Sequence, residues 1–163
     1  QDNTFAEFTL RHEGLSVNSD TVWVLETNLD DVTGQTVGYL IEKLLAHGAL
    51  DAVAMPVQMK KSRPGLMLQV ITEPNRVAEI EKIIFTETPT FGIRKYPVWR
   101  SKLSREVVKI KTPYGKIRVK VGRLSGKVIT ASPEYDDCRA AAIKHKVPLR
   151  KVINAARRLH TSK

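Results

Sequence analysis

Cysteine, clustered histidine and long apolar segments are scarce or absent in this chain of 163 residues. The single cysteine, Cys138, excludes an intramolecular disulfide framework and a cysteine-based zinc site. We expect it to be a small buried residue, with a soft ligand for a late transition metal as the alternative. The four histidines lack the spacing of metal ligands, so the sequence predicts no histidine metal site. No apolar run approaches the roughly 18 residues of a membrane helix and no signal-peptide pattern occurs, so we expect a cytoplasmic protein without a membrane partner.

Aromatic residues are also few, at 6% of the chain, and the phosphate-binding pattern GxxxxGK[ST] is absent. Charge, by contrast, is abundant and uneven. Residues 1–58 hold nine carboxylates and two basic groups, whereas residues 94–127 hold twelve Lys or Arg and only one acid, Glu106. The excess of +11 (twelve minus one) indicates a polyanionic partner near the middle of the chain. The solvated face of a basic protein is the alternative explanation.

Extended and helical periodicities alternate between residue 21 and about residue 100. β-Branched and apolar runs predict strands, and apolar residues at spacings of three and four predict helices. The resulting order is β-α-β-β-α-β, which is that of the ferredoxin-like split βαβ arrangement, so we predict an α+β fold. The predicted elements are strands at 21–27, 50–57 and 66–71, an extended stretch from residue 91, and helices at 33–48 and from residue 74.

The rest of the chain predicts a hairpin followed by helices. Two strands, 105–112 and 115–121, are joined by the short turn Pro113-Tyr114-Gly115. The run Ser132-Pro133-Glu134 is typical of a helix start, with a capping hydroxyl, a proline and an acid in the first turn, and Pro148 opens a last helix. We therefore divide the chain into a linker to a preceding part of a longer polypeptide, a ferredoxin-like core, and a subdomain of hairpin and C-terminal helices. Their predicted bounds are 1–20, 21–103 and 104–163.

Polar residues gather at the ends of these elements, where binding sites are usually built. Asp30 and Asp31 follow the first strand and precede a helix, so they can bind a hard cation that also holds phosphate oxygens. Helix capping by Asp31 is the alternative. The polar run between the second and third strands, Gln58 to Gly65, includes three cations and a hydroxyl beside a glycine, which can grip a di- or triphosphate. These four residues are Lys60, Lys61, Ser62 and Arg63.

Two further clusters have weaker signals. The third polar cluster runs from Glu87 to Arg94 and leads to Arg100. Its residues Thr88, Arg94 and Arg100 suit an anion or a ribose, although a turn between a helix and a strand explains the same residues. In the fourth cluster, Tyr135 could stack on a base while a carboxylate of Glu134 or Asp137 accepts from an exocyclic amine. Acids that complement a helix dipole are the alternative there.

The four segments ETNLDDVTGQ, MKKSRPG, ETPTFGIR and PEYDDC, in this order and spacing, resemble the C-terminal domain of the LarC family of nickel-insertion proteins. The resemblance covers roughly residues 20–160, and Pro89 and Phe91 depart from the family's usual form. It implies a CTP-dependent nickel chelatase, or cyclometallase, of the lyase class that matures the cofactor of lactate racemase. Nickel would be inserted into pyridinium bis-thiocarboxylic acid mononucleotide to give the nickel-pincer nucleotide, while CTP is hydrolysed to CMP and pyrophosphate.

The resemblance also implies roles for individual residues. Asp30 and Asp31 would hold a magnesium or manganese ion that bridges the triphosphate of CTP. Lys60 and Arg63 would act as the catalytic cations, since charge that develops during hydrolysis needs fixed positive groups. The further expected contacts to the nucleotide are Lys61, Ser62, Thr88, Arg94, Arg100, Glu134, Tyr135 and Asp137. The family also implies a homo-oligomer and a histidine-rich N-terminal region, missing here, that supplies nickel.

Two other functions fit parts of the sequence. An RNA-binding module would use a ferredoxin-like sheet with a cationic surface, but the predicted central strand 66–71 lacks the aromatic residues that stack on bases. Nucleic acid is therefore not the expected partner. A regulatory domain that binds CTP without catalysis is the second alternative.

Overall fold

A computed structural model describes residues 18–158, which form two compact units. One unit is Ser19–Arg100, and the other contains residues 101–158. The predicted linker at 1–20 lies mostly outside the described residues, and the first strand already begins at Asn18. Within the described part of the chain, no helix is long and apolar enough to cross a membrane.

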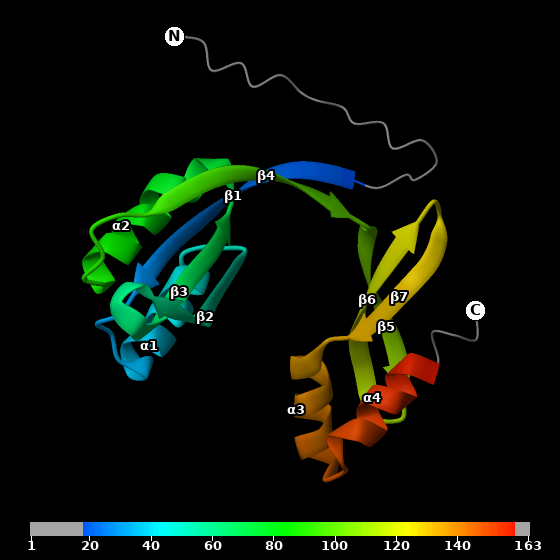
Figure 1. Ribbon diagram of the computed structural model, residues 1–163. Helices are drawn as coiled ribbons and strands as arrows, with labels where there is room; N and C mark the ends of the chain where they lie inside the picture. Colours follow the sequence, from blue (N-terminus) through cyan, green and yellow to red (C-terminus); the bar gives the residue numbers. More distant parts are fainter. Residues whose placement is uncertain (1–17, 159–163) are drawn as a thin grey trace. The chain divides into compact units, whose positions relative to one another are not determined.

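The unit 19–100 is built around a four-stranded sheet with strand order β2-β3-β1-β4. β3 pairs antiparallel with both β1 and β2, and β4 runs opposite to β1 (Figure 1). This topology confirms the predicted ferredoxin-like α+β core. Its elements are β1 (Asn18–Leu29), α1 (Gly34–Ala46), β2 (Asp51–Met59), the 3₁₀ turn η1 (Lys60–Ser62), β3 (Arg63–Thr72), the 3₁₀ turn η2 (Pro74–Arg76), α2 (Val77–Glu87) and β4 (Arg94–Lys102).

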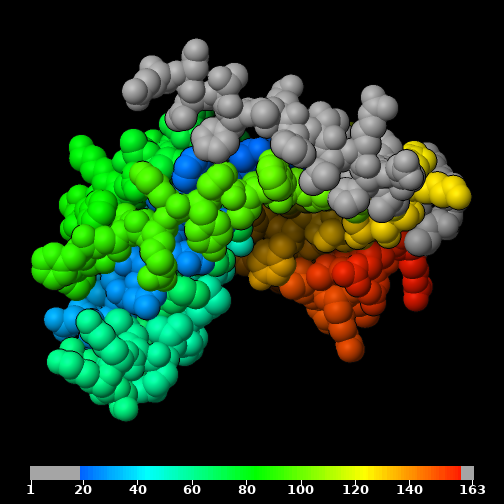
Figure 2. All heavy atoms as spheres, turned by 45° about the horizontal axis from the view of Figure 1, so that its top comes forward, coloured from blue at the N-terminus to red at the C-terminus, as the bar shows by residue number. Residues whose placement is uncertain are grey.

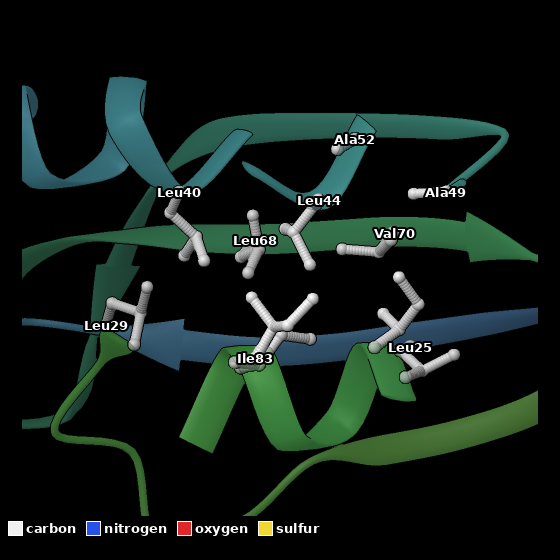
Figure 3. Packing of buried hydrophobic residues seen from close by; sticks show 11 residues of the cluster. Leu25, Leu29, Leu40, Leu44, Ala49, Ala52, Leu68, Val70 and Ile83 are labelled. Atoms are coloured by element: carbon white, nitrogen blue, oxygen red, sulfur yellow. The ribbon is translucent and has the colours of Figure 1, made fainter. Parts of the chain in front are cut away.

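The core of this unit lies between the sheet and its two helices. Leu40 and Leu44 of α1 and Ile83 of α2 meet Leu25 and Leu68 of the sheet in Figure 3. These side chains are almost fully buried, and burying one large aliphatic side chain contributes about 1.5–3 kcal/mol. The apolar spacing of the sequence therefore identified the buried face of each helix. The opposite face of the sheet mixes polar side chains, such as Glu26 and Gln69, with apolar ones, such as Val24 and Ile71.

Local chemistry fixes the ends of α1. The Thr33 hydroxyl accepts a hydrogen bond from the Thr36 amide at 3.2 Å, so Thr33, and not Asp31, caps the helix. This leaves Asp31 exposed just beyond the strand. At the other end, α1 ends at Ala46, and Gly48, just after the His47 cap, adopts a positive φ of 87°, which a glycine reaches without steric cost. Gly48 therefore terminates the helix as predicted.

The unit 101–158 contains a three-stranded antiparallel sheet of order β5-β6-β7, followed by two helices (Figure 1). The predicted hairpin is present, but the sequence prediction missed β7. Ser132 and Pro133 belong to this strand, so their prediction as a helix start is wrong, and Glu134 precedes the helix without a side-chain cap. The elements are β5 (Ser104–Thr112), β6 (Gly115–Leu124), β7 (Lys127–Pro133), α3 (Tyr135–His145) and α4 (Leu149–Arg158).

The two helices of this unit pack on one face of its sheet. Ile117 of β6 forms a core with Cys138 of α3 and with Val152 and Ala156 of α4. Cys138 is fully buried and unpaired, and burial raises the pKa of its thiol. The expectation of a small buried residue is therefore confirmed.

Candidate functional site

The end of β1 is the point where the first two polar clusters meet. The Arg63 guanidinium donates a hydrogen bond from Nη1 to Oδ2 of Asp30 at 3.3 Å. The strand register explains this contact, because Leu29 lies opposite Leu66 and the start of β3 therefore runs beside the end of β1. The structure thus brings the predicted acidic pair and the predicted cationic loop to one place.

The turn between β2 and β3 has an unusual backbone. Lys61 and Ser62 both adopt positive φ angles, 60° and 57°, although neither is a glycine. A left-handed conformation costs an L-residue roughly 1–2 kcal/mol, and such costs are often retained at functional positions. The side chains of this turn are exposed, as the turquoise atoms near residue 60 in Figure 2 illustrate. Within residues 18–158, neither Lys60 nor Lys61 forms an ion pair, so both cations are free to meet a ligand.

Gly65 explains how the turn can lie so close to β1. A Cβ atom at this position would lie 2.9 Å from the Leu29 carbonyl oxygen and would also collide with the Met59 sulfur. Any larger residue would push β3 away from the end of β1. The glycine of the MKKSRPG segment therefore permits the close approach of β3 to the end of β1.

Arg94, at the start of β4, extends the cluster on the other side of β1. Its Nη2 donates to Oδ1 of Asn28 at 2.9 Å, and its Nε lies 3.6 Å from Oε2 of Glu26. Glu26 also accepts from Gln69 Nε2 and from the Tyr96 hydroxyl, each at 2.8 Å. These hydrogen bonds lower the pKa of Glu26, and the bond from Gln69 has the largest effect. The Glu26 carboxylate in turn raises the pKa of Tyr96.

We call Asp30, Asp31, Lys60, Lys61, Ser62, Arg63 and Arg94 the strand-end cluster. All seven residues are among those predicted from the sequence, whereas the hydrogen bonds that join Glu26 to Gln69 and Tyr96 and support Arg94 are not. Only the pairing of β1 with β3 and β4 brings these three residues together, and no local motif could have indicated it.

The loop between α2 and β4 holds its threonines in structural hydrogen bonds. Thr88 is buried, and its hydroxyl donates to the Ile84 carbonyl at 2.8 Å, which ends α2. Thr90, which the sequence analysis did not single out, lies 2.6 Å from the Thr27 hydroxyl, and Thr27 also donates to the Gly92 carbonyl at 3.0 Å. The loop is therefore fixed to β1, and the predicted ligand contact of Thr88 would require its present bond to break.

Arg100 lies away from the strand-end cluster. Its Nε and Nη2 donate to the two carboxylate oxygens of Asp20 at 3.0 and 2.8 Å. Asp20 precedes Asp30 by ten residues on an extended strand, which separates the two positions by roughly 30 Å. The structure thus gives Arg100 a role in joining β4 to the first half of β1.

The fourth cluster belongs to the unit 101–158, where its acids pair with β6. Asp137 accepts hydrogen bonds from the Arg118 amide, from Nε at 2.9 Å and from Nη2 at 2.7 Å. These bonds lower the pKa of Asp137 to about 2. Glu134 forms an ion pair with Lys120 at 2.9 Å. Tyr135, the next residue after Glu134, is exposed.

The acids of the strand-end cluster fit a nucleotide-bound cation. Among residues 18–158 there is no group of three or more His, Cys, Asp or Glu side chains that could enclose a metal ion. Magnesium in nucleotide sites commonly takes one or two carboxylates and completes its coordination with phosphate oxygens and water. Asp30 and Asp31, two adjacent carboxylates of which the first contacts Arg63, match that donor set, and such a cation would neutralise phosphate charge.

Comparison with known proteins identifies the family. The model of the family described as "Nickel insertion protein" matches residues 5–153. The chain belongs to this family. It is 45% identical over 139 residues to a putative nickel insertion protein of Myxococcus xanthus, covering 85% of this chain and 36% of that protein. It is 46% identical over 129 residues to the pyridinium-3,5-bisthiocarboxylic acid mononucleotide nickel insertion protein of Geobacillus kaustophilus, covering 78% of this chain and 31% of that protein. The chain thus spans about a third of the length of these members of the nickel insertion protein family.

A solved structure from the same family shares the fold. LarC2, the C-terminal domain of a cyclometallase involved in the synthesis of the NPN cofactor of lactate racemase, superposes in its apo form with a TM-score of 0.80. The two sequences are 38% identical, and the match covers 85% of this chain and 96% of LarC2. Protein MK0293 of Methanopyrus kandleri matches with a TM-score of 0.63 and 28% identity, over 85% of this chain and 88% of that protein. These findings confirm the resemblance and the fold predicted from the sequence.

Proposed function

We propose that this chain is the nucleotide-binding part of a nickel insertase. In this proposal it binds CTP with magnesium or manganese, and nickel is inserted into pyridinium-3,5-bisthiocarboxylic acid mononucleotide to form the nickel-pincer nucleotide. CTP is hydrolysed to CMP and pyrophosphate. The substrate comes from the name of the relative in Geobacillus kaustophilus, and the choice of CTP comes from the resemblance of the four sequence segments.

The contact between Asp30 and Arg63 is the observation that carries the proposal. It joins two carboxylates to a turn that holds three cations, and a triphosphate with a divalent cation needs both kinds of group. Asp30 and Asp31 hold the cation, Lys60, Lys61 and Ser62 bind the phosphates, and Arg94 contacts phosphate or ribose. Lys60 and Arg63 stabilise the charge that develops when the phosphate bond breaks.

The predicted residues outside the strand-end cluster have other roles in this proposal. Thr88 ends α2 through its bond to Ile84, and Arg100 joins β4 to β1 through its bond to Asp20, so both have structural roles here. The reading of cytosine by Glu134, Tyr135 or Asp137 stays a prediction, and the carboxylates of Glu134 and Asp137 would first have to leave Lys120 and Arg118.

Binding of CTP in the presence of manganese tests the proposal, measured by isothermal titration calorimetry on the full chain. Asp30→Asn should weaken binding at least about tenfold and reduce its dependence on manganese, because even residues that only support metal ligands cost tenfold or more. Lys60→Gln should weaken binding by about tenfold, since it removes a charge-assisted hydrogen bond to phosphate. Lys82→Gln removes an exposed lysine of α2 and serves as the matched control, with unchanged affinity.

The alternatives predict different results in the same experiment. An RNA-binding module would bind RNA and ignore CTP with manganese, which would reject the proposal. The face of the unit 19–100 sheet opposite the helices argues against this alternative, because Tyr96, whose hydroxyl already binds Glu26, is the one aromatic residue found there between residues 19 and 100.

Catalysis and assembly need separate measurements, because the chain spans about a third of its relatives. Pyrophosphate release from CTP, with the thiocarboxylated mononucleotide present, would show that this chain alone catalyses CTP hydrolysis. Binding without release would support a domain that only binds CTP. We also propose a homo-oligomer, which light scattering would test by a mass above that of the 18.3 kDa chain.

A further inference from the structure

The outer face of the three-stranded sheet carries a regular array of cations. Along β6, the buried residues Ile117, Val119 and Val121 alternate with basic side chains, which are exposed. The basic residues of β5 lie on the same side, because Lys111 lies opposite Lys116 and Lys109 lies opposite Arg118. We call this surface the cationic face, and it consists of Arg105, Lys109, Lys111, Lys116, Arg118 and Lys120.

The arrangement of these charges costs stability. Like charges directly opposite each other on antiparallel strands repel, and Lys111 with Lys116 is such a pair. Lys109 lies opposite Arg118, where Asp137 offsets part of the charge. Only part of the charge is neutralised within the unit. Arg118 binds Asp137 and Lys120 binds Glu134, whereas no ion pair is found for the other four residues of the face among residues 18–158. An unfavourable arrangement of this kind favours the binding of an anionic ligand, which would relieve the repulsion.

The net charge of the whole unit also favours an anionic ligand. Residues 101–158 contain sixteen Lys or Arg and four Asp or Glu, an excess of twelve, while residues 19–100 contain nine and ten, a balance of −1. The strand-end cluster, in the other unit, combines acids with bases and suits a cation-bound triphosphate. The cationic face, by contrast, suits an anion that arrives without a metal ion.

We propose that the cationic face binds the pyridinium mononucleotide that receives the nickel. This inference rests on the proposed function, which requires a second anionic nucleotide besides CTP. The mononucleotide carries a phosphate and two thiocarboxylates, so its anionic groups can each meet a lysine or arginine of the array. Tyr135 lies next to Glu134, which contacts Lys120, and its exposed ring offers a surface on which a cationic pyridinium ring can stack.

A nucleic acid fits the cationic face less well. Proteins that bind single strands combine a basic groove with several aromatic residues on which bases stack. The outward-facing residues of β5 and β6 include no aromatic residue. Tyr135 follows Glu134, the partner of Lys120, whereas Tyr114 in the turn between β5 and β6 packs against the buried core of the unit. One aromatic ring suits a single nucleotide with one ring to stack.

Calorimetric titration of the full chain with nicotinic acid mononucleotide tests this inference. That probe has a pyridinium ring, a ring carboxylate and a 5′-phosphate. The triple variant Lys109→Gln, Lys111→Gln, Lys116→Gln should weaken its binding by about tenfold, since each exposed charge contributes a factor of about two. A matched triple variant, Lys144→Gln, Arg150→Gln, Lys151→Gln, removes the same charge from the helices of the same unit and should stay within about twofold.

Two further readouts separate the possible results. The first triple variant should melt at the same or a higher temperature than the original chain, because it removes the repulsion between Lys111 and Lys116, so lost binding cannot result from unfolding. CTP with manganese should bind both triple variants as it binds the original chain.

Several outcomes would overturn the inference. Equal weakening in the two triple variants would assign the effect to net charge, and tighter binding of a competing RNA oligonucleotide would assign the face to nucleic acid. Absence of mononucleotide binding, with CTP and manganese still bound, would reject this inference and leave the proposed function standing. Absence of CTP binding in the original chain would instead reject the proposed function.

Discussion

At the scale of single residues, the strained turn of the strand-end cluster connects stability with binding. Ser62 has a φ of 57°, which glycine adopts without steric cost. Ser62→Gly should therefore stabilise the unit by about 0.5–1 kcal/mol, measured by urea unfolding. The same variant should bind CTP with manganese more weakly, because it lacks the hydroxyl that we assign to phosphate. Ser19→Gly, on the extended strand β1, is the matched control and should give no gain in stability.

A second residue, Asp137, makes stability depend on pH. Its pKa is about 2 in the folded protein, against an ordinary value of 3.8, because Arg118 donates three hydrogen bonds to the carboxylate. Because the pKa is lower in the folded protein, the ionised carboxylate stabilises the fold at any pH above the pKa of the unfolded chain. This contribution is lost as the pH falls from about 4 to about 2. Asp137→Asn should cost about 1–2 kcal/mol at neutral pH, a value reduced for solvent screening of the half-exposed Arg118.

Urea unfolding over a pH series would measure this effect of Asp137. The difference between the variant and the original chain should disappear near pH 2. The neighbouring Asp136→Asn, an exposed acid in the same helical turn, should have only a small effect at any pH. A constant difference across the series would contradict the electrostatic explanation.

At the residue scale, the sequence predicted polar positions better than their partners. Asp30, Lys60 and Arg63 were identified because each follows or precedes a strand, and strand ends are local features. The bidentate pair of Arg100 with Asp20 joins residues 80 positions apart, and the Glu26 carboxylate accepts from Gln69 and Tyr96, 43 and 70 positions away. Such partners depend on strand register, which local periodicity does not contain.

At the scale of elements, the close approach of β3 to the end of β1 depends on Gly65. Gly65→Ala should destabilise the unit by about 1–3 kcal/mol, because the new methyl group would meet the Leu29 carbonyl and the Met59 sulfur. Gly38→Ala, within α1, is the matched control, since no atom lies within 4 Å of its added Cβ. It should stabilise the unit by up to about 1 kcal/mol through helix propensity. Thermal unfolding of the two variants should therefore shift in opposite directions.

The strand β7, which was not predicted from the sequence, ends where a helix-start pattern and strand pairing compete. Ser132-Pro133-Glu134 has the composition of a helix start, yet Pro133 lies opposite Val119 at the end of β7. A proline is tolerated there because β7 is an edge strand and needs no donor on its outer side. The Glu134 amide then donates to the Arg118 carbonyl at 2.8 Å, so the chain leaves the sheet one residue before α3 begins. Only pairing with β6 decides this outcome, and that pairing is not local.

At the scale of the whole molecule, the two units differ in charge and in proposed ligand. The unit 19–100 holds nearly balanced charges and the strand-end cluster, while the unit 101–158 holds the excess of positive charge. Each unit also has its own buried core. We therefore expect CTP binding to depend on the first unit and mononucleotide binding on the second.

A fragment of residues 18–102 tests this division, because it retains β1 through β4 and the whole strand-end cluster. It should unfold cooperatively, since its sheet and two helices enclose a continuous core of their own. Its affinity for CTP with manganese should stay within about threefold of the full chain, a difference below 1 kcal/mol. A much larger loss would place essential contacts in the unit 101–158 and favour base reading by Glu134, Tyr135 or Asp137. In the fragment, Asp30→Asn should abolish the manganese dependence, which ties any remaining binding to the end of β1.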